Sequence, residues 1–296
     1  LDVLHQYGIS ELEAVRFNMV NLFSNMLCEE CLRPQFIVSG LHVVVMNMVK
    51  HLDIQATAIA CIAKLATSEN FYQSFVPLEV LEAWENIVSG PNINQVTLTA
   101  IFEVCSAPPT EQANPSDPII FQTRPTLLPA LINAYPTTNN GIRAGIIKIL
   151  TCVLETPHAD VLLEHPSVFP FFAELIQTDD PLVSAEKKRL FSKLSIHRQA
   201  TMVQHLLTPI LELCFALPSA FSFGLLQLMV VSNPDVIDVL SPSTLSRIEP
   251  LLVYHARGKP FSDEVQDAID ILHFLLATTF AKLHSEVQTQ VHDHLV

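Results

Sequence analysis

The sequence has little glycine and little charge. Seven glycines in 296 residues leave few positions for tight hairpin turns, and 16% of the residues are charged against 49% that are hydrophobic. This composition disfavours an all-β fold and supplies enough apolar side chains for a core. Twenty prolines stand mostly between apolar stretches, where they end one helix and open the next. We therefore expect an all-α fold.

The sequence also lacks an apolar run long enough to span a membrane, which takes about 20 residues. The stretch that comes nearest, 221–231, is bounded by Pro218 and Pro234. No basic and then apolar leader opens the chain, and four of the six cysteines sit among apolar residues of expected helices, as core cysteines do. We expect no transmembrane segment and an intracellular location, cytoplasmic more than nuclear.

Enzyme and metal signatures are missing. There is no Walker phosphate loop, no dinucleotide-binding glycine motif, no HExxH and no GxSxG. We expect no catalytic residue and no cofactor. Cys28 and Cys31 form a close thiol pair, but a structural zinc site needs two further ligands, and no second pair exists. We interpret the pair as a helix end and expect no metal site.

The chain is acidic, with a formal net charge of −14. Sequence-independent nucleic-acid binding depends on Lys and Arg that neutralise phosphates, so no nucleic-acid ligand is expected. Protein partners with basic patches suit this charge better. These residues do not define an oligomeric state.

What is present is a repeated helical pattern. Ile54, Ala58, Ile62 and Leu65 are spaced by four, four and three residues, which places them on one face of an α-helix. The stripe recurs with first members at 15, 54, 93, 142, 183, 220 and 264, at gaps of 39, 39, 49, 41, 37 and 44 residues. A second apolar helix is expected between stripes, at 41–51, 80–88, 126–134, 168–176, 202–213 and 245–255.

Short segments such as 159–163 and 235–240 complete a unit of three helices. In period and helix order the chain resembles armadillo repeats, whose units are about 40 to 47 residues long, and HEAT repeats and formin-type regulatory domains look similar. The resemblance implies one elongated domain over residues 1–296, a right-handed α-solenoid of about seven armadillo-like repeats. The longest gap contains 107–117, which we interpret as an inserted surface loop.

In armadillo proteins that bind peptides, the longest helix of each repeat lines a concave groove. The resemblance and the charge pattern give as partner-binding groove candidates Asn21, Asn25, Lys64, Glu103, Arg143, Lys148, Lys187, Arg189, Lys193, Leu226, Val230 and Phe274. Only Asn25 keeps the residue type of the nuclear-import adaptors, whose grooves carry Trp and Asn ladders, so import-signal binding in that manner is not expected. Trp84 falls on a second helix and is expected to pack.

A basic cluster stands out in the acidic chain. Its members are Arg143, Lys148, Lys187, Lys188, Arg189, Lys193 and Arg198. Two interpretations remain open. The cluster is either a solvated helix face with Asp180 and Glu186 as local partners, or a central groove that receives an acidic or phosphorylated segment of a protein partner.

The sequence as a whole favours a non-catalytic protein-binding scaffold or adaptor that uses the concave groove. The alternative is a regulatory or substrate-recognition module of a larger multidomain protein, such as a formin-type autoinhibitory domain or a ubiquitin-ligase receptor. A third hypothesis is self-assembly through apolar groove positions at Leu226, Val230 and Phe274.

Overall fold

The structure, a computed structural model, describes residues 2–8, 10–107, 119–177, 183–194, 200–216, 222, 224–226 and 229. Every regular element in these ranges is a helix. The chain divides into two compact units: unit 1 is Leu1–Val168 with Pro181–Glu186, and unit 2 is Phe169–Asp180 with Lys187–Val296. The predicted inserted loop, apart from Ala107, and the helices expected beyond residue 229 lie outside the described residues. The single domain over 1–296 stays a prediction.

Unit 1 repeats an arrangement of short, middle and long helices. The long helices are α2 (Glu13–Met26), α5 (Gln55–Ala66), α7 (Gln95–Ser106) and α10 (Asn140–Leu154). The middle helices are α1 (Asp2–Gly8), α4 (Leu41–Met48), α6 (Leu78–Ser89) and α9 (Leu127–Ala134). The short elements are η1 (Glu30–Leu32), α3 (Arg33–Val38), η2 (Gln73–Phe75), α8 (Ile120–Thr123), η3 (Tyr135–Thr137) and α11 (Ala159–Leu163).

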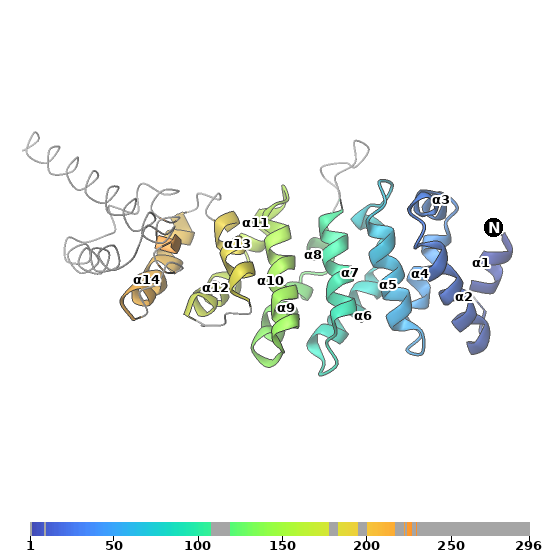
Figure 1. The fold of residues 1–296 in the computed structure, drawn as a ribbon, viewed down its shortest axis with the longest axis horizontal. Helices are drawn as coiled ribbons and strands as arrows, with labels where there is room; N and C mark the ends of the chain where they lie inside the picture. The colour runs from blue at the N-terminus through green and yellow to red at the C-terminus, as the bar shows by residue number, and fades with distance from the viewer. Residues whose placement is uncertain are drawn as a thin grey trace, which may run out of the picture. The chain divides into compact units, whose positions relative to one another are not determined.

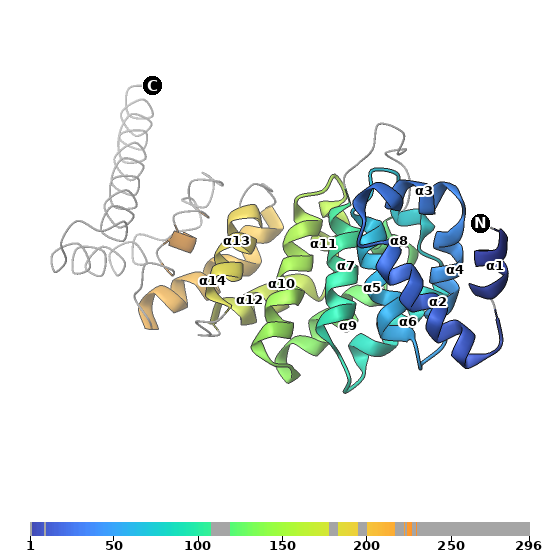
Figure 2. The same ribbon diagram turned by 45° about the vertical axis from the view of Figure 1, so that its right-hand side comes forward.

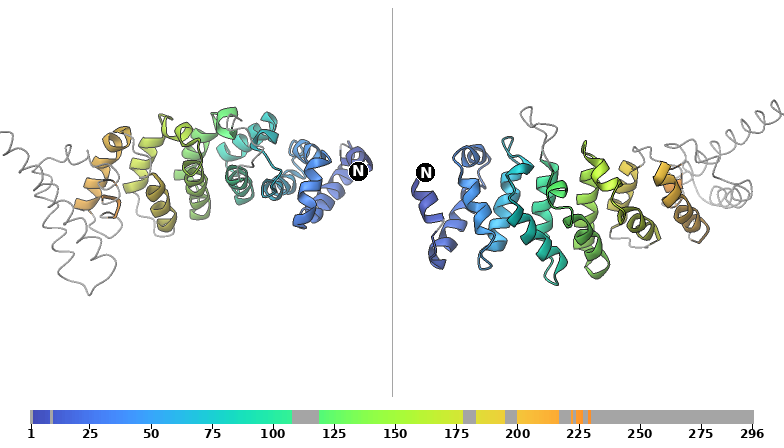
Figure 3. Two further views of the ribbon diagram at one scale, coloured as in Figure 1. Left: turned by 90° about the horizontal axis from the view of Figure 1, so that it is seen from above. Right: turned by 180° about the vertical axis from the view of Figure 1, so that it is seen from behind.

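Long helices of neighbouring repeats lie side by side. Helix α2 packs against α5, α5 against α7, and α7 against α10, as Figures 1 and 2 show. The middle helices α6 and α9 pack against each other in the same way, and Figure 3 shows unit 1 from above and from behind. The stack therefore repeats the same kind of contact from one repeat to the next, as an α-solenoid does.

Asparagine side chains fix where two of the long helices begin. Asn94 Oδ1 accepts a hydrogen bond from the Thr97 backbone N–H at 2.9 Å, and Asn139 Oδ1 accepts one from the Ile142 N–H at 3.1 Å. Each bond satisfies a donor that the first turn of a helix leaves unpaired. These caps set the starts of α7 and α10 and so the register of their exposed faces.

The predicted stripes form the core of unit 1. Ile54, Ala58, Ile62 and Leu65 are at most 2% exposed. The corresponding positions of α7 and α10 are also buried, namely Thr97, Ile101 and Val104, and Ile142, Ile146, Leu150 and Val153. Full burial of a Leu or Ile side chain contributes roughly 1.5–3 kcal/mol. The spacing thus correctly predicted the inward face of α5, α7 and α10, whereas the first members Val15 and Ile93 of two stripes, and Met26 at the end of α2, are half-buried.

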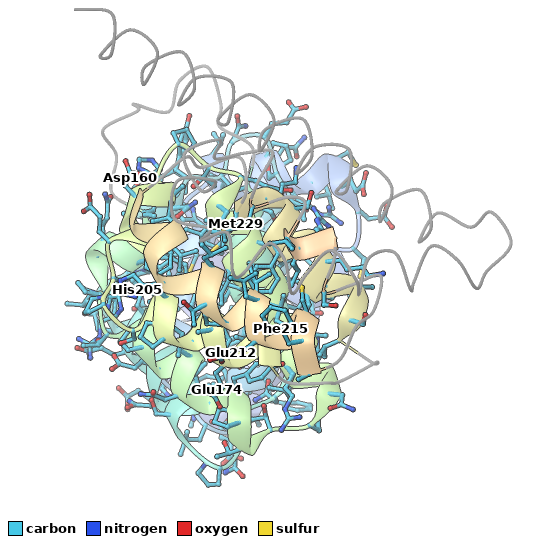
Figure 4. The ribbon with its side chains drawn as sticks, turned by 90° about the vertical axis from the view of Figure 1, so that its left-hand side faces the viewer. Asp160, Glu174, His205, Glu212, Phe215 and Met229 are labelled. Atoms are coloured by element: carbon cyan, nitrogen blue, oxygen red, sulfur yellow. The ribbon has the colours of Figure 1, made fainter. Side chains whose placement is uncertain are left out.

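Unit 2 contains most of α12 (Val168–Gln177), most of α13 (Ser184–Leu194) and all of α14 (Ala200–Ala216). Aromatic side chains join these helices. The Phe172 and Phe191 rings meet with centroids 6.1 Å apart, and the Phe169 ring stacks on the His205 imidazole at 5.4 Å. Figure 4 labels His205 and Glu212 on α14. Unit 2 is therefore held by ring contacts that link α12 to both other helices.

None of the helices among the described residues has the length and apolar character needed to cross a membrane.

Candidate functional site

A pocket of about 380 Å³ opens between the long helices α5 and α7 of unit 1. It is lined by Ala60, Ala63 and Lys64 of α5 with the adjoining Thr67, by Gln95, Val96, Thr99 and Glu103 of α7, and by Arg33 of α3. Two of the predicted groove residues, Lys64 and Glu103, are thus brought to one pocket. They come from equivalent positions of successive repeats.

The α7 side of this pocket is a polar stripe. Gln95, Thr99 and Glu103 follow one another at intervals of four residues, so they share one helix face. Gln95 and Thr99 are exposed and Glu103 is half-buried. Within the described part of the chain, no hydrogen bond or ion pair involves their side chains. The stripe therefore presents an amide, a hydroxyl and a carboxylate whose hydrogen-bonding capacity is unused.

The α5 side differs because its cations are held by the protein. Lys64 Nζ donates to the Ser24 carbonyl oxygen at 3.0 Å, to Ser24 Oγ at 3.2 Å and to Cys28 Sγ at 3.3 Å. An ammonium group has three donors, so all three are used. The acceptors are uncharged groups of and just beyond α2, and no carboxylate among the described residues pairs with Lys64. Its hydrogen bonds are satisfied while its positive charge is not neutralised.

Arg33 adds a second cation to the same side. Its Nε donates to the Leu27 carbonyl oxygen at 2.9 Å, and its guanidinium donates to Thr67 Oγ1 at 2.7 Å. Its ion pair with Glu30 is long, at 3.7 Å, and the Glu30 side chain is 86% exposed. Exposed pairs of this kind gain little Coulomb energy. The α5 side of the pocket is therefore positive, and the α7 side negative.

Three of the lining residues, Ala60, Ala63 and Val96, are apolar. Ala60 is half-buried and Ala63 is 9% exposed, while Val96 is 38% exposed. Methyl-sized side chains let the backbone of a bound segment approach the helices closely, and their apolar surface gives a contact that does not depend on sequence. The pocket lining thus combines apolar and polar side chains.

Several predicted groove residues lie outside this pocket or are engaged elsewhere. On α2, Asn21 is half-buried and Asn25 is exposed. The Arg143 guanidinium donates to the carbonyl oxygens of Tyr135 and Pro136 at 3.1 and 2.9 Å and lies 5.4 Å above the Tyr135 ring. Lys148 Nζ pairs with Glu186 Oε1 at 3.5 Å. Arg143 thus binds the first two carbonyl groups of η3, and Lys148 has the local acidic partner that the solvated-face interpretation expects.

In unit 2 the structure departs from the prediction at two positions. Lys187 is 3% exposed, because it takes a buried stripe position of α13 beside Phe191 and Leu194. Leu226 is fully buried, so its apolar side chain packs in the core and is not an exposed groove residue. Arg189 is exposed and Lys193 half-buried, and both have interactions within the protein. Val230 and Phe274 lie outside the described residues.

Burial separates the cysteines into two kinds. Cys28 and Cys31 are exposed free thiols just beyond α2, whereas Cys61, Cys105, Cys152 and Cys214 are buried. Burial raises the pKa of Cys61 to about 11, although nearby Lys64 and Ser24 oppose the shift. It raises the pKa of Cys214 to about 12. Among the described residues, no group of three or more metal-binding side chains comes together.

These environments predict selective alkylation. At pH 8, N-ethylmaleimide should modify Cys28 and Cys31 at least about 100-fold faster than the buried thiols, because burial keeps the reagent away and disfavours the reactive thiolate at Cys61, Cys105 and Cys214. Intact-mass spectrometry and peptide mapping of the native protein would measure the two classes. In denaturant all six cysteines should react together. Rapid labelling of Cys61 in the native protein would contradict its burial.

Comparison with known proteins identifies the fold. No protein-family model matches the chain, and no curated protein matches it by sequence. Solved structures do match. An engineered protein superposes with a TM-score of 0.59 at 10% identity over 79% of this chain and 96% of its own. A designed armadillo repeat protein in complex with the peptide (KR)4 gives 0.58 at 12% identity, covering 77% of this chain and 97% of its own.

A further similar structure is that of computationally designed armadillo repeat proteins for modular peptide recognition. It gives a TM-score of 0.52 at 10% identity, over 79% of this chain and 98% of that one. At these identities the likeness concerns the fold. Together with the stacked long helices of unit 1 and the periodic core, it shows that the chain has the all-α, armadillo-type repeat fold.

Proposed function

We propose that this chain is a non-catalytic protein-binding scaffold or adaptor, and that its long helices hold an extended segment of a partner protein. The α5–α7 pocket is the part of that binding surface described here. The observation that carries the proposal is the unpartnered stripe Gln95, Thr99 and Glu103, which lines one pocket together with Ala60 and Ala63. An extended backbone brings N–H and C=O groups that need partners, and an amide and a hydroxyl supply both donors and acceptors.

The similar structures support this proposal. One designed armadillo repeat protein is in complex with a peptide, and another group was designed for modular peptide recognition. Their binding is a property of those proteins. For this chain, the pocket between two stacked long helices supports the proposal.

The acidic or phosphorylated partner predicted for the central groove stays a prediction. Arg143 and Lys148 have protein partners and Lys187 is buried. Among the described residues, the other exposed or half-buried side chains of the basic cluster are Lys188, Arg189 and Lys193. These three lie on α13 of unit 2, and none of them lines the α5–α7 pocket.

A pocket-filling variant tests the proposed function. Peptides of about ten residues would be selected from a random display library on the intact chain, and their affinities measured by fluorescence anisotropy. Thr99→Trp places an indole at an exposed lining position and should weaken these peptides by about tenfold or more.

The matched control is Asn86→Trp, which adds the same ring at an exposed position of the middle helix α6. It should leave binding unchanged. Selected peptides that bind the Thr99→Trp variant as tightly as the unaltered chain would contradict the proposal.

A further inference from the structure

The two sides of the α5–α7 pocket carry opposite charges that the protein does not neutralise against each other. Glu103 on α7 is half-buried and has no cationic partner among the described residues. Lys64 on the opposite side has no carboxylate partner. We infer that the pocket selects an extended segment of mixed charge, with a basic side chain against Glu103 and an acidic side chain toward Lys64. This inference rests on the proposed function.

The basic residue follows from the state of Glu103. A half-buried carboxylate loses part of its hydration and regains favourable energy from a cation. Among side chains, the Arg guanidinium suits this role best because its planar donors match the two carboxylate oxygens. Thr99 and Gln95 lie one and two helical turns away from Glu103 on the same face, so they can bind the backbone beside that side chain.

The acidic residue follows from the opposite side. The Lys64 ammonium donates its three hydrogen bonds to neutral acceptors, and the ion pair of Arg33 with exposed Glu30 is weak. Two cations there attract a negative side chain and repel a second positive one. A run of basic residues is thus penalised on this side, which is how unlike charges produce specificity as well as affinity.

Helix spacing sets the separation of the two charges. Packed helices lie about 8–10 Å apart, and an extended chain advances about 3.3 Å per residue. A segment that crosses from α5 to α7 therefore needs its acidic and basic residues about two to three positions apart. For a segment bound in one backbone direction, only one order of the two charges along the chain places the basic side chain against Glu103 and the acidic side chain toward Lys64.

Four synthetic peptides of about ten residues test this pattern in a serine and threonine background. One carries Asp and then Arg, two positions apart, one has the reverse order, one is neutral, and one alternates Lys and Arg. Fluorescence anisotropy at low salt should show one mixed-charge order binding at least about tenfold tighter than the other three. Equal or tighter binding of the Lys-Arg peptide would overturn the inference.

Charge-altered proteins assign the effect to the two residues. Glu103→Gln should remove the preference for the mixed-charge peptide over the neutral one, and Glu103→Lys with Lys64→Glu should favour the reverse order. If circular dichroism shows that the charge reversal disturbs folding, Lys64→Met replaces it, because methionine keeps an unbranched side chain of similar length without the charge. It should weaken the discrimination against the Lys-Arg peptide.

The outcomes separate this inference from the proposed function. If the neutral peptide binds as tightly as the mixed-charge peptides, and Thr99→Trp abolishes both, the charge selection is wrong and the peptide-binding role stands. If neither the four peptides nor library-selected peptides bind in a manner sensitive to Thr99→Trp, the proposed function fails and this inference fails with it.

Discussion

Replacing Trp84 with alanine should lower the free energy of unfolding by about 3–5 kcal/mol. The indole is fully buried on the middle helix α6 and is the largest side chain in the core. Helix α6 packs on its neighbour α9, and rigidly packed helices close only part of the cavity that an indole leaves. Urea denaturation followed by far-ultraviolet circular dichroism measures this loss.

Trp84→Phe is the matched control. The indole Nε1 is buried and has no hydrogen-bond partner among the described residues. Replacement by phenylalanine therefore reduces the filled volume but removes no hydrogen bond. Its cost should be less than half that of the alanine variant. Equal costs for the two variants would show that filled volume is not what Trp84 contributes. The result would also test the prediction that this lone tryptophan packs in the core.

The fold was predictable from the sequence because burial on a helix depends on spacing alone. The stripe that begins at Ile54 is buried at all four positions, and the short helix predicted at 159–163 is α11, Ala159–Leu163. The ends of helices were less accurate. The helix expected at 41–51 ends at Met48 in α4, where the chain turns before Ile54 starts the next core stripe.

The candidate site was only partly predictable. Helical register predicted Lys64 and Glu103 at equivalent positions of successive long helices, and both residues line the α5–α7 pocket. It could not show that Lys64 Nζ reaches Ser24, 40 residues earlier, or that Arg143 turns back to the carbonyl of Tyr135. Those contacts depend on side-chain torsions and on how neighbouring helices pack. Charge alone therefore overestimated how many basic side chains are available to a partner.

Lys187 and Leu226 were predicted as groove residues, but both side chains are buried. A lysine is usually exposed, but the stripe position of Lys187 outweighs its charge and buries it. Glu103 was a predicted groove residue, and the sequence also carried a usable signal for Gln95, which was not among the candidates. Gln95, Thr99 and Glu103 are polar at intervals of four on a helix whose other face is apolar, a pattern that indicates one exposed polar face.

Replacing Gly145 with valine should lower the free energy of unfolding by about 1–3 kcal/mol. Gly145 lies inside α10 where that helix meets α7, and a Cβ there would stand 3.0 Å from Leu98 Cδ1 and 3.5 Å from Leu98 Cβ. Glycine in a helix costs about 1 kcal/mol relative to alanine. Its use here is explained by the close approach of two long helices. Denaturant unfolding of the variant measures the strain.

Leu98→Ala supplies the second arm of a double-mutant cycle. Alone it should cost about 2–5 kcal/mol, because Leu98 is 1% exposed. Combined with Gly145→Val, it makes room for the added methyl groups, so the two costs should sum to more than the cost of the double variant by about 1–2 kcal/mol. Strict additivity would mean that the valine does not press on Leu98. A positive coupling would show that α7 packs on α10 at this position in solution. The same packing orients α7, whose polar stripe lines the pocket.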